Sequence, residues 1–354
     1  MGGQRREEDV INVGDDSSQA AGLQREWETS QRWAGIQRDH SGEDVIRRRG
    51  PLTADHILAR SGARRLRELL GRENAVQVVG ADTAHQAGQL VQARPQAIYL
   101  SGDSVPQLVR QINCAIVDAG QRAVPIVADA QAPFDRELDV FQLMESMIEA
   151  GAGGVHFEDR RPWPTEYGDP TGKVLLPTGE CIETLKAARL AADVLNVPAL
   201  LMARTYAHET SLLTSDVDER DHEFLTGERT ADGLHRVQPG LYACITRALA
   251  FAPYADLLWL ETSAPNLAQA RAFADIIYSQ YPGKLLAYSC SPAFNWAQLD
   301  DPSIAQFQET LAALGYRFQL TSTSIRQPEP IDPDASTGAP AGSKEVAQFA
   351  VSAV

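Results

Sequence analysis

The chain has 354 residues, and its 32 basic and 47 acidic side chains give it a formal net charge of −15. This length suits two ordinary domains or one large α/β barrel, and either can bury a substantial core. An acidic balance of this size argues against a general nucleic-acid binder or a membrane-surface protein, because polyanions would repel the chain. We therefore expect neither nucleic acid nor membrane among its partners.

The location of the protein is indicated by its N-terminus and its cysteines. The N-terminal MGGQRREEDV lacks the apolar stretch of a signal peptide, and no apolar run approaches the roughly 18 residues that a membrane span needs. The four cysteines lie far apart without a C-x-x-C pair, which suits a reducing cytosol better than a disulfide or zinc framework. The sequence thus predicts a cytoplasmic protein.

The ends of the chain differ in character from its middle. Residues 1–21 are polar and unpatterned, which predicts a disordered tail, and residues 22–70 predict a helical lead-in. From residue 327 to residue 354 the chain is rich in Pro, Ala and Gly, and this composition predicts a second disordered tail. We expect one folded domain over residues 22–326.

Short apolar runs recur through that domain and alternate with segments of helical periodicity, as over residues 180–195. Most of these runs are continuously apolar, which is typical of strands covered on both faces in a parallel sheet. Eight such strands alternating with helices predict an α/β fold, a (β/α)8 TIM-type barrel. The alternative is a doubly wound sheet, which is less favoured because no G-x-G-x-x-G motif follows an early strand. The runs are AVQVVGA (75–81), AIYLSG (97–102), PIVADA (125–130), GGVHFED (153–159), PALLMART (198–205), ADLLWLET (255–262), KLLAYSCS (284–291) and YRFQLTST (316–323).

Polar residues gather where these predicted strands end, and barrel chemistry is built at the carboxyl ends of the strands. Several carboxylates facing one arginine suit a hard cation such as Mg²⁺ together with an anionic, oxygen-rich substrate that the arginine grips. The alternative is that these charges cap helices or pair across the barrel mouth. His156 lies inside a strand run and is interpreted as a buried core histidine. The strand-end residues are Tyr99, Ser101, Gly102, Asp129, Glu158, Arg204, Glu261, Ser289, Ser291 and Ser322.

Many of these residues lie in segments that resemble the isocitrate lyase family, within the isocitrate lyase and phosphoenolpyruvate mutase superfamily. The resemblance covers about residues 22–325 in the family's order. It implies a barrel enzyme that binds Mg²⁺, with Mn²⁺ as an alternative, and a small 2-oxo or 2-hydroxy acid. The enzyme would make or break a C–C bond through an enolate-like intermediate. The segments include IYLSG (98–102), PIVADA (125–130), GVHFED (154–159), GKVLLPT (172–178), MART (202–205), TSDVDERD (214–221), TGERT (226–230), WLET (259–262) and CSPAFNW (290–296).

By matching position, the resemblance implies a role for each strand-end residue. Asp129 would hold the metal, with Glu158 and Glu261 acting mainly through its waters. Tyr99 would lie beside the substrate oxygen as a candidate base. The residues that would bind substrate are Ser101, Gly102, Arg204, Ser289, Ser291 and Ser322.

The chain also departs from the family's pattern. Family members carry K-K-C-G-H in the loop after the fourth strand, and its cysteine protonates the departing succinate. In the loop of the same length here, Tyr167 stands at the cysteine and Asp169 at the histidine. A phenol with a pKa near 10 donates a proton less readily than a thiol near 8.5. Tyr167 and Asp169 thus join Tyr99 as candidate catalytic residues.

Further departures affect the metal site, the substrate clasp and assembly. The family's D-x-E becomes Asp129-Ala130-Gln131, its A-R-T-D ends in Tyr206, and the long loop after Ser101-Gly102 is missing. The clasp N-C-S-P-S becomes residues 289–293, S-C-S-P-A. The helices that interlock family subunits after the eighth strand are replaced by the Pro-rich tail, so we expect a looser homodimer or homotetramer.

Three functions stay open at this point. The first is a lyase that keeps the metal and oxo-acid half of the site but acts on a small carboxylic acid other than isocitrate. The second is a catalytically inactive paralogue with a binding or regulatory role. The third is another enolate reaction, such as C–C hydrolysis, decarboxylation or phosphonate rearrangement.

Overall fold

The computed structural model describes residues 13–49, 55–72, 75–81, 83, 85–86, 95–102, 104–118, 120, 124–130, 140–162, 173–262, 264–289 and 301–322. Its centre is a closed barrel in which each strand pairs in parallel with both neighbours, in the order β1-β13-β12-β11-β7-β4-β3-β2. Each of the eight apolar runs contains one of these strands, so the predicted barrel is confirmed. The strands are β1 (Val76–Ala81), β2 (Ala97–Leu100), β3 (Ile126–Asp129), β4 (Gly154–Glu158), β7 (Leu200–Thr205), β11 (Leu257–Leu260), β12 (Leu285–Ser289) and β13 (Tyr316–Ser322).

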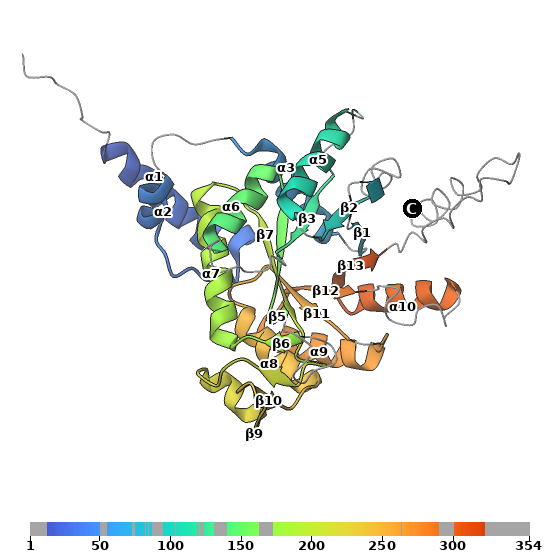
Figure 1. Cartoon of the computed structure of the whole chain (residues 1–354). Coiled ribbons are helices and arrows are strands. Elements are labelled where there is room, and N and C mark those ends of the chain that lie inside the picture. Colours follow the sequence, from blue (N-terminus) through green and yellow to red (C-terminus); the bar gives the residue numbers. More distant parts are fainter. Residues whose placement is uncertain are drawn as a thin grey trace, which may run out of the picture.

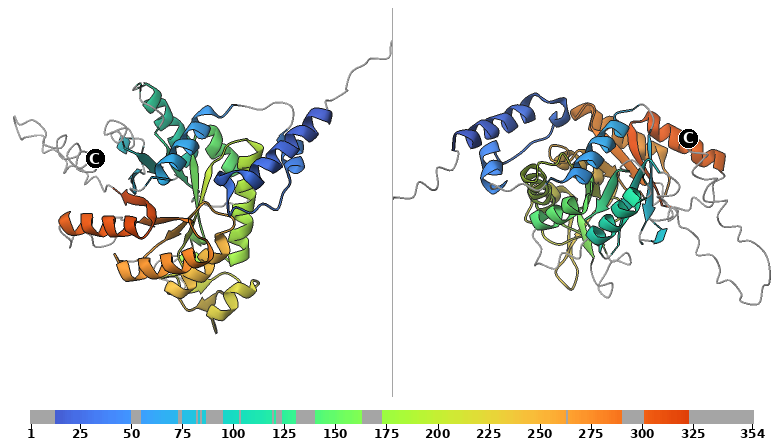
Figure 2. Two further views of the ribbon diagram at one scale, coloured as in Figure 1. Left: turned by 180° about the vertical axis from the view of Figure 1, so that it is seen from behind. Right: turned by 90° about the horizontal axis from the view of Figure 1, so that it is seen from above.

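Helices surround this barrel on its outer face (Figures 1 and 2). One apolar cluster fills the space between the helices and the strands, and a second fills the barrel interior, where Tyr99, Trp259 and Phe318 pack together. Because both faces of the strands are buried, their sequences are continuously apolar. The helices are α3 (Ile57–Leu70), α5 (Val105–Asp118), α6 (Val140–Ala150), α7 (Thr178–Val194), α8 (Leu241–Phe251), α9 (Leu267–Gln280) and α10 (Asp301–Ala313).

The N-terminal lead-in consists of α1 (Val13–Thr29), η1 (Gln31–Trp33) and α2 (Gly42–Arg49). The expectation of disorder over residues 1–21 is therefore wrong for residues 13–21, which are helical. Ala20 is buried where α1 packs on α2, and the missing side chain of Gly42 permits this approach, since a Cβ there would lie 2.3 Å from the Ala20 carbonyl oxygen. Tertiary packing thus stabilises a helix whose polar sequence has little apolar periodicity. Residues 1–12 and 327–354 of the predicted tails lie outside the described residues.

Buried ion pairs fasten the lead-in to the amino-terminal end of the barrel. Asp256, just before β11, accepts hydrogen bonds from Arg32 and Arg189 at 2.5 Å each and from the Leu201 amide at 2.9 Å. Nearby, Arg38 donates to Asp193 of α7 at 2.7 Å. This end of the barrel is closed by charge and packing, which leaves the opposite end for chemistry.

A second, five-stranded sheet was not predicted from the sequence, because its strands are only two to five residues long. Its order is β5-β6-β8-β10-β9, and β9 and β10 lie at the lower end of the view in Figure 1. The sheet and the nearby η3 are β5 (Arg160–Pro162), β6 (Lys173–Leu175), β8 (Leu212–Leu213), η3 (Glu219–Phe224), β9 (Leu225–Arg229) and β10 (His235–Val237).

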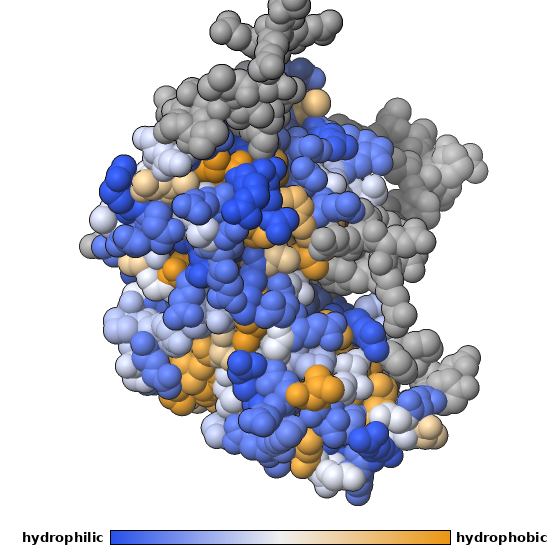
Figure 3. All heavy atoms as spheres, turned by 90° about the vertical axis from the view of Figure 1, so that its left-hand side faces the viewer, coloured by the Kyte–Doolittle hydropathy of each residue, from blue (hydrophilic) through white to orange (hydrophobic). Residues whose placement is uncertain are grey.

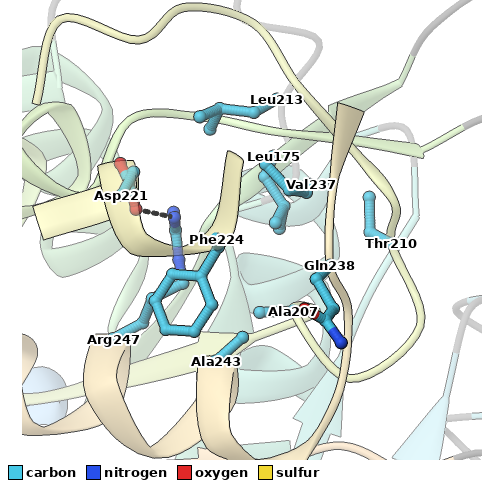
Figure 4. Close-up of a pocket in the computed structure, with 10 residues that line it drawn as sticks. All are labelled: Leu175, Ala207, Thr210, Leu213, Asp221, Phe224, Val237, Gln238, Ala243 and Arg247. Atoms are coloured by element: carbon cyan, nitrogen blue, oxygen red, sulfur yellow. Dashed lines mark hydrogen bonds and ion pairs between the residues drawn. The ribbon is translucent and has the colours of Figure 1, made fainter. Parts of the chain in front are cut away.

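A buried arginine joins this sheet to the barrel. Arg247 of α8 donates to Asp159, which follows β4, at 2.8 Å and to Asp221 of η3 at 2.7 Å. Figure 4 shows Arg247 and Asp221 at the edge of a small cavity that Leu175 and Phe224 also line. With about 10 Å³ of free volume, the cavity has room for a single water molecule and none for a substrate.

One face of the molecule agrees with the polar composition. The face in Figure 3 is mostly hydrophilic, and its apolar residues form small separate groups. Among the described residues, no helix is long and apolar enough to cross a membrane.

Candidate active site

The candidate site lies at the carboxyl ends of neighbouring barrel strands. Asp129 and Glu158 are the last residues of β3 and β4, Arg204 lies near the end of β7, and Glu261 directly follows β11. The register pairs Asp129 with His156 across β3 and β4, and Glu158 with Arg204 across β4 and β7. Parallel strands in a closed barrel end on one face, so residues distant in sequence meet there.

The first part of the site is a buried group around Asp129. The Tyr99 hydroxyl donates to Asp129 Oδ2 at 2.6 Å and lies 3.1 Å from His156 Nδ1, which is itself 3.3 Å from Asp129 Oδ1. Burial and the Asp129 carboxylate raise the pKa of Tyr99 well above its ordinary value. The phenol therefore keeps its proton at neutral pH and acts here as a hydrogen-bond donor.

The second part is Arg204, held between two carboxylates. Its Nη2 lies 2.5 Å from Glu261 Oε2, and its Nη1 lies 3.4 Å from Glu158 Oε1. Burial alone would lower the pKa of Arg204, but Glu261 and the neighbouring oxygens outweigh burial and raise it. Burial raises the pKa of Glu261, and Arg204 opposes that shift. A fully charged guanidinium in a water-poor site is suited to binding a substrate carboxylate.

The third part is Tyr206, which lies directly after β7. Its hydroxyl donates to Glu158 Oε1 at 2.8 Å. Its ring is close to three cations, since the Arg160 and Arg204 guanidinium carbons lie 4.4 and 4.6 Å from the ring centroid and Lys173 Nζ lies 4.5 Å from it. Burial raises the pKa of Tyr206, so the phenol stays neutral among these charges.

Asp129, His156 and Glu158 form a candidate metal site, called here the cation-binding group, because their ligand atoms all lie within 4.8 Å of one another. Magnesium in proteins takes one or two carboxylates and completes its shell with water and substrate oxygens. The two carboxylates of this group match that donor set. The residues present therefore fit a hard divalent cation.

The structure brings Tyr99, Asp129, Glu158, Arg204 and Glu261 together, as the sequence predicted. Other predicted residues lie at neighbouring strand ends: Ser101 and Gly102 follow β2, with Gly102 at a φ of +126° that favours glycine, and buried Ser289 ends β12. Ser322 ends β13, but its side chain is not among those described. The loop residues Tyr167, Asp169 and Ser291 lie outside the described residues.

Sequence reasoning did not assign His156, Arg160 and Lys173 to the site. His156 is fully buried, as expected, but its ring contacts Asp129 and Tyr99 of the site. The signal was available, because His156 and Glu158 stand two apart in one strand and so point to the same face. Arg160 and Lys173 lie in β5 and β6, strands that the sequence did not predict.

Comparisons with known proteins agree with this architecture and with the earlier resemblance. The model of the isocitrate lyase family matches residues 109–232 and 227–326. The isocitrate lyase of Halalkalibacterium halodurans is 46% identical over 334 residues, covering 85% of this chain and 78% of that protein. The isocitrate lyase of Escherichia coli strain K12 is 46% identical over 340 residues, covering 84% and 78%.

Solved structures share the fold at low sequence identity. Oxaloacetate acetylhydrolase superposes with a TM-score of 0.52 at 19% identity, covering 74% of this chain and 80% of that one. For 2,3-dimethylmalate lyase the TM-score is 0.52 at 18% identity, covering 74% and 78%. The matched family model and the identity to its members together establish that this chain belongs to the isocitrate lyase family.

Proposed function

We propose that the protein is a Mg²⁺-dependent enzyme that makes or breaks a C–C bond in a small 2-oxo or 2-hydroxy carboxylic acid other than isocitrate. The observation that carries the proposal is the position of Arg204, whose guanidinium pairs with Glu158 of the cation-binding group. A cation and a carboxylate-binding arginine at one strand-end face are what an α-oxo acid requires, since its carboxylate and neighbouring oxygen bind side by side.

In this proposal, Asp129 would hold the cation, with Glu158 and Glu261 acting mainly through its waters, and the cation would supply stabilisation of negative charge on the substrate oxygens. Arg204 binds and orients the substrate carboxylate, with Ser101, Gly102 and Ser289 at the neighbouring strand ends. Tyr99, whose protonated hydroxyl donates to Asp129 at 2.6 Å, stays a prediction for the residue that transfers a proton beside the substrate oxygen. Tyr167 and Asp169 stay predictions for the second proton transfer.

Two features favour a substrate other than isocitrate. The loop of residues 160–171 carries a tyrosine where the family has its acid cysteine, and a phenol is the weaker acid. Tyr206 also places a neutral phenol against Glu158, where the family's A-R-T-D has a carboxylate. The second change lies at the cation-binding group itself, which keeps Asp129 and Glu158, while the family's D-x-E here ends in Gln131.

A second candidate function is binding without turnover. It is favoured by the contacts that Glu158 already makes. Its carboxylate accepts a hydrogen bond from the Tyr206 hydroxyl at 2.8 Å and pairs with Arg160 at 2.8 Å and Arg204 at 3.4 Å. A carboxylate engaged by three donors has fewer lone pairs for a metal's waters.

Turnover separates the two candidates. A panel of 2-oxo and 2-hydroxy acids, isocitrate included, is incubated with the protein and Mg²⁺, and products are followed by mass spectrometry. We expect Mg²⁺-dependent cleavage or condensation of one acid, abolished in Asp129→Ala. No turnover of any acid would favour the binding role, and efficient cleavage of isocitrate would overturn the proposed substrate.

A further inference from the structure

Asp159 directly follows Glu158, is almost fully buried, and takes no part in the proposed reaction. Its Oδ1 accepts a hydrogen bond from the Tyr206 backbone amide at 2.8 Å. Its own backbone amide donates to the Arg204 carbonyl oxygen at 3.2 Å. Asp159 thus fastens the end of β7 to the end of β4, at the two residues of β7 and its extension whose side chains belong to the site.

Asp159 also holds the base of the hairpin formed by β5 and β6. Its chain neighbour Arg160 begins β5, and its carbonyl oxygen accepts from the amide of Leu176, which directly follows β6, at 2.9 Å. The hairpin base is therefore joined to the end of β4 through one residue. Three donors contact the Glu158 carboxylate, and each belongs to a segment that Asp159 holds: Arg160, Arg204 and Tyr206.

A buried arginine anchors Asp159 from the side of α8. Arg247 Nε donates to Asp159 Oδ2 at 2.8 Å, and Arg247 Nη2 donates to the Leu176 carbonyl oxygen at 2.5 Å. Arg247 Nη1 donates to Asp221 Oδ1 at 2.7 Å, the contact drawn in Figure 4. Burial alone would lower the pKa of Arg247, but Asp159 and neighbouring groups outweigh burial and raise it. Because a charged guanidinium is planar, these three bonds fix the direction from which Asp159 is held.

The Asp159–Arg247 pair is better explained by geometry than by stability. A buried ion pair contributes little net stability, because the cost of taking both charges out of water offsets most of their attraction. Its directional hydrogen bonds do fix positions, and groups that bind a substrate have to be held within about 0.5 Å of the productive geometry by the residues behind them.

We propose that Asp159, anchored by Arg247, is a positioning residue that fixes Arg204 relative to Glu158, so that the guanidinium is preset to bind the substrate carboxylate. This inference rests on the proposed function, in which Arg204 binds that carboxylate. Asp159 itself touches neither the substrate nor the cation in this proposal.

Asp221 provides a matched control, because it is the other carboxylate that Arg247 holds. Asp159 and Asp221 are both almost fully buried, and each accepts from one backbone amide at 2.8 Å. The amide that Asp221 binds belongs to Thr178, the first residue of α7, whose hydroxyl also donates to Asp221 at 2.6 Å. Asp159→Asn and Asp221→Asn each leave Arg247 with one carboxylate. Asp221→Asn should therefore lower the Tm at least as much as Asp159→Asn does.

Oxalate binding with Mg²⁺ present is measured by calorimetry, at a temperature at which thermal unfolding shows each protein to be folded. We expect Asp159→Asn to weaken oxalate binding about tenfold or more, because Arg204 is no longer held in place. Asp221→Asn should bind oxalate within about twofold of the unchanged protein, although its Tm falls as far. If Asp159→Asn does not fold, Asp159→Glu and Asp221→Glu give the same comparison, since the added methylene displaces each carboxylate and keeps its charge.

The inference is overturned if the Asp159 variant binds oxalate within about twofold of the unchanged protein. It is also overturned if the Asp159 and Asp221 variants lose the same affinity, because that result is what a merely structural role predicts. If the unchanged protein does not bind oxalate with Mg²⁺, the proposed function itself fails, and this inference fails with it.

Discussion

The ion-pair network at the amino-terminal end of the barrel leads to a prediction about stability. Asp256 is almost fully buried, and its carboxylate accepts from Arg32, Arg189 and the Leu201 amide. Asp256→Asn removes the negative charge but keeps the shape, and it leaves two buried guanidinium groups without a counter-ion. Breaking a buried ion pair in this way costs about 3–5 kcal/mol. For a domain of this size, that cost corresponds to a Tm lower by about 5–15 °C.

A matched control is available at the surface. Asp55 also pairs with an arginine, Arg60, at 2.7 Å, but the Asp55 side chain is 62% exposed. Exposed pairs contribute at most about 1 kcal/mol, so Asp55→Asn should lower the urea midpoint and the Tm only slightly. Both variants are compared by urea and thermal unfolding, with oxalate binding as a measure of the intact site. Equal losses in the two variants would refute the argument that burial makes the Asp256 pairs important.

Three further predictions follow from the described contacts. The pKa values of Asp193 and Asp256 lie below 3.8 in the folded protein despite burial, because arginines and, for Asp193, His40 stabilise the charged carboxylates. The contribution of these carboxylates to folding stability is therefore complete above about pH 4 and is lost as the pH falls further. The urea midpoint should drop below that pH, and it should drop less in Asp256→Asn. Gly153→Ala puts a Cβ 2.6 Å from backbone atoms of α3, and it should lower the free energy of unfolding in urea by about 1–3 kcal/mol. Gly22→Ala puts a Cβ where nothing lies within 4 Å, and it should stabilise α1 by up to about 1 kcal/mol. Arg204→Lys keeps the charge but loses the two-pronged geometry, and oxalate affinity measured by calorimetry should fall about tenfold or more.

The barrel could be predicted from the sequence because its strands carry a strong, simple signal. Runs such as PIVADA (125–130) and ADLLWLET (255–262) are apolar on both faces, and each carries a charged residue, Asp129 or Glu261, at the strand's carboxyl end. That pattern places Asp129 and Glu261 on one face of the barrel without knowledge of any contact. The candidate site followed from the same rule.

What the sequence did not reveal depends on contacts between distant segments. The strands β5 and β6 are three residues each and partly charged, so neither hydrophobic periodicity nor strand propensity identifies them in the sequence. Because these strands were not predicted, Arg160 and Lys173 were not assigned to the site. Helix α1 looks like a polar tail until Gly42 allows α2 to approach it. His156 was assigned to the core correctly, but its contact with Asp129 requires the β3–β4 register.

The central claim is that Asp129 and Arg204 together bind a cation and a small oxo acid, and one titration tests it most directly. Oxalate, which mimics the enolate fragment of a 2-oxo acid, is titrated into the protein by calorimetry with Mg²⁺ and again with EDTA. We expect binding that requires Mg²⁺ and disappears in Asp129→Ala. Absence of binding in both conditions, or binding that is unchanged by EDTA and by Asp129→Ala, would contradict it.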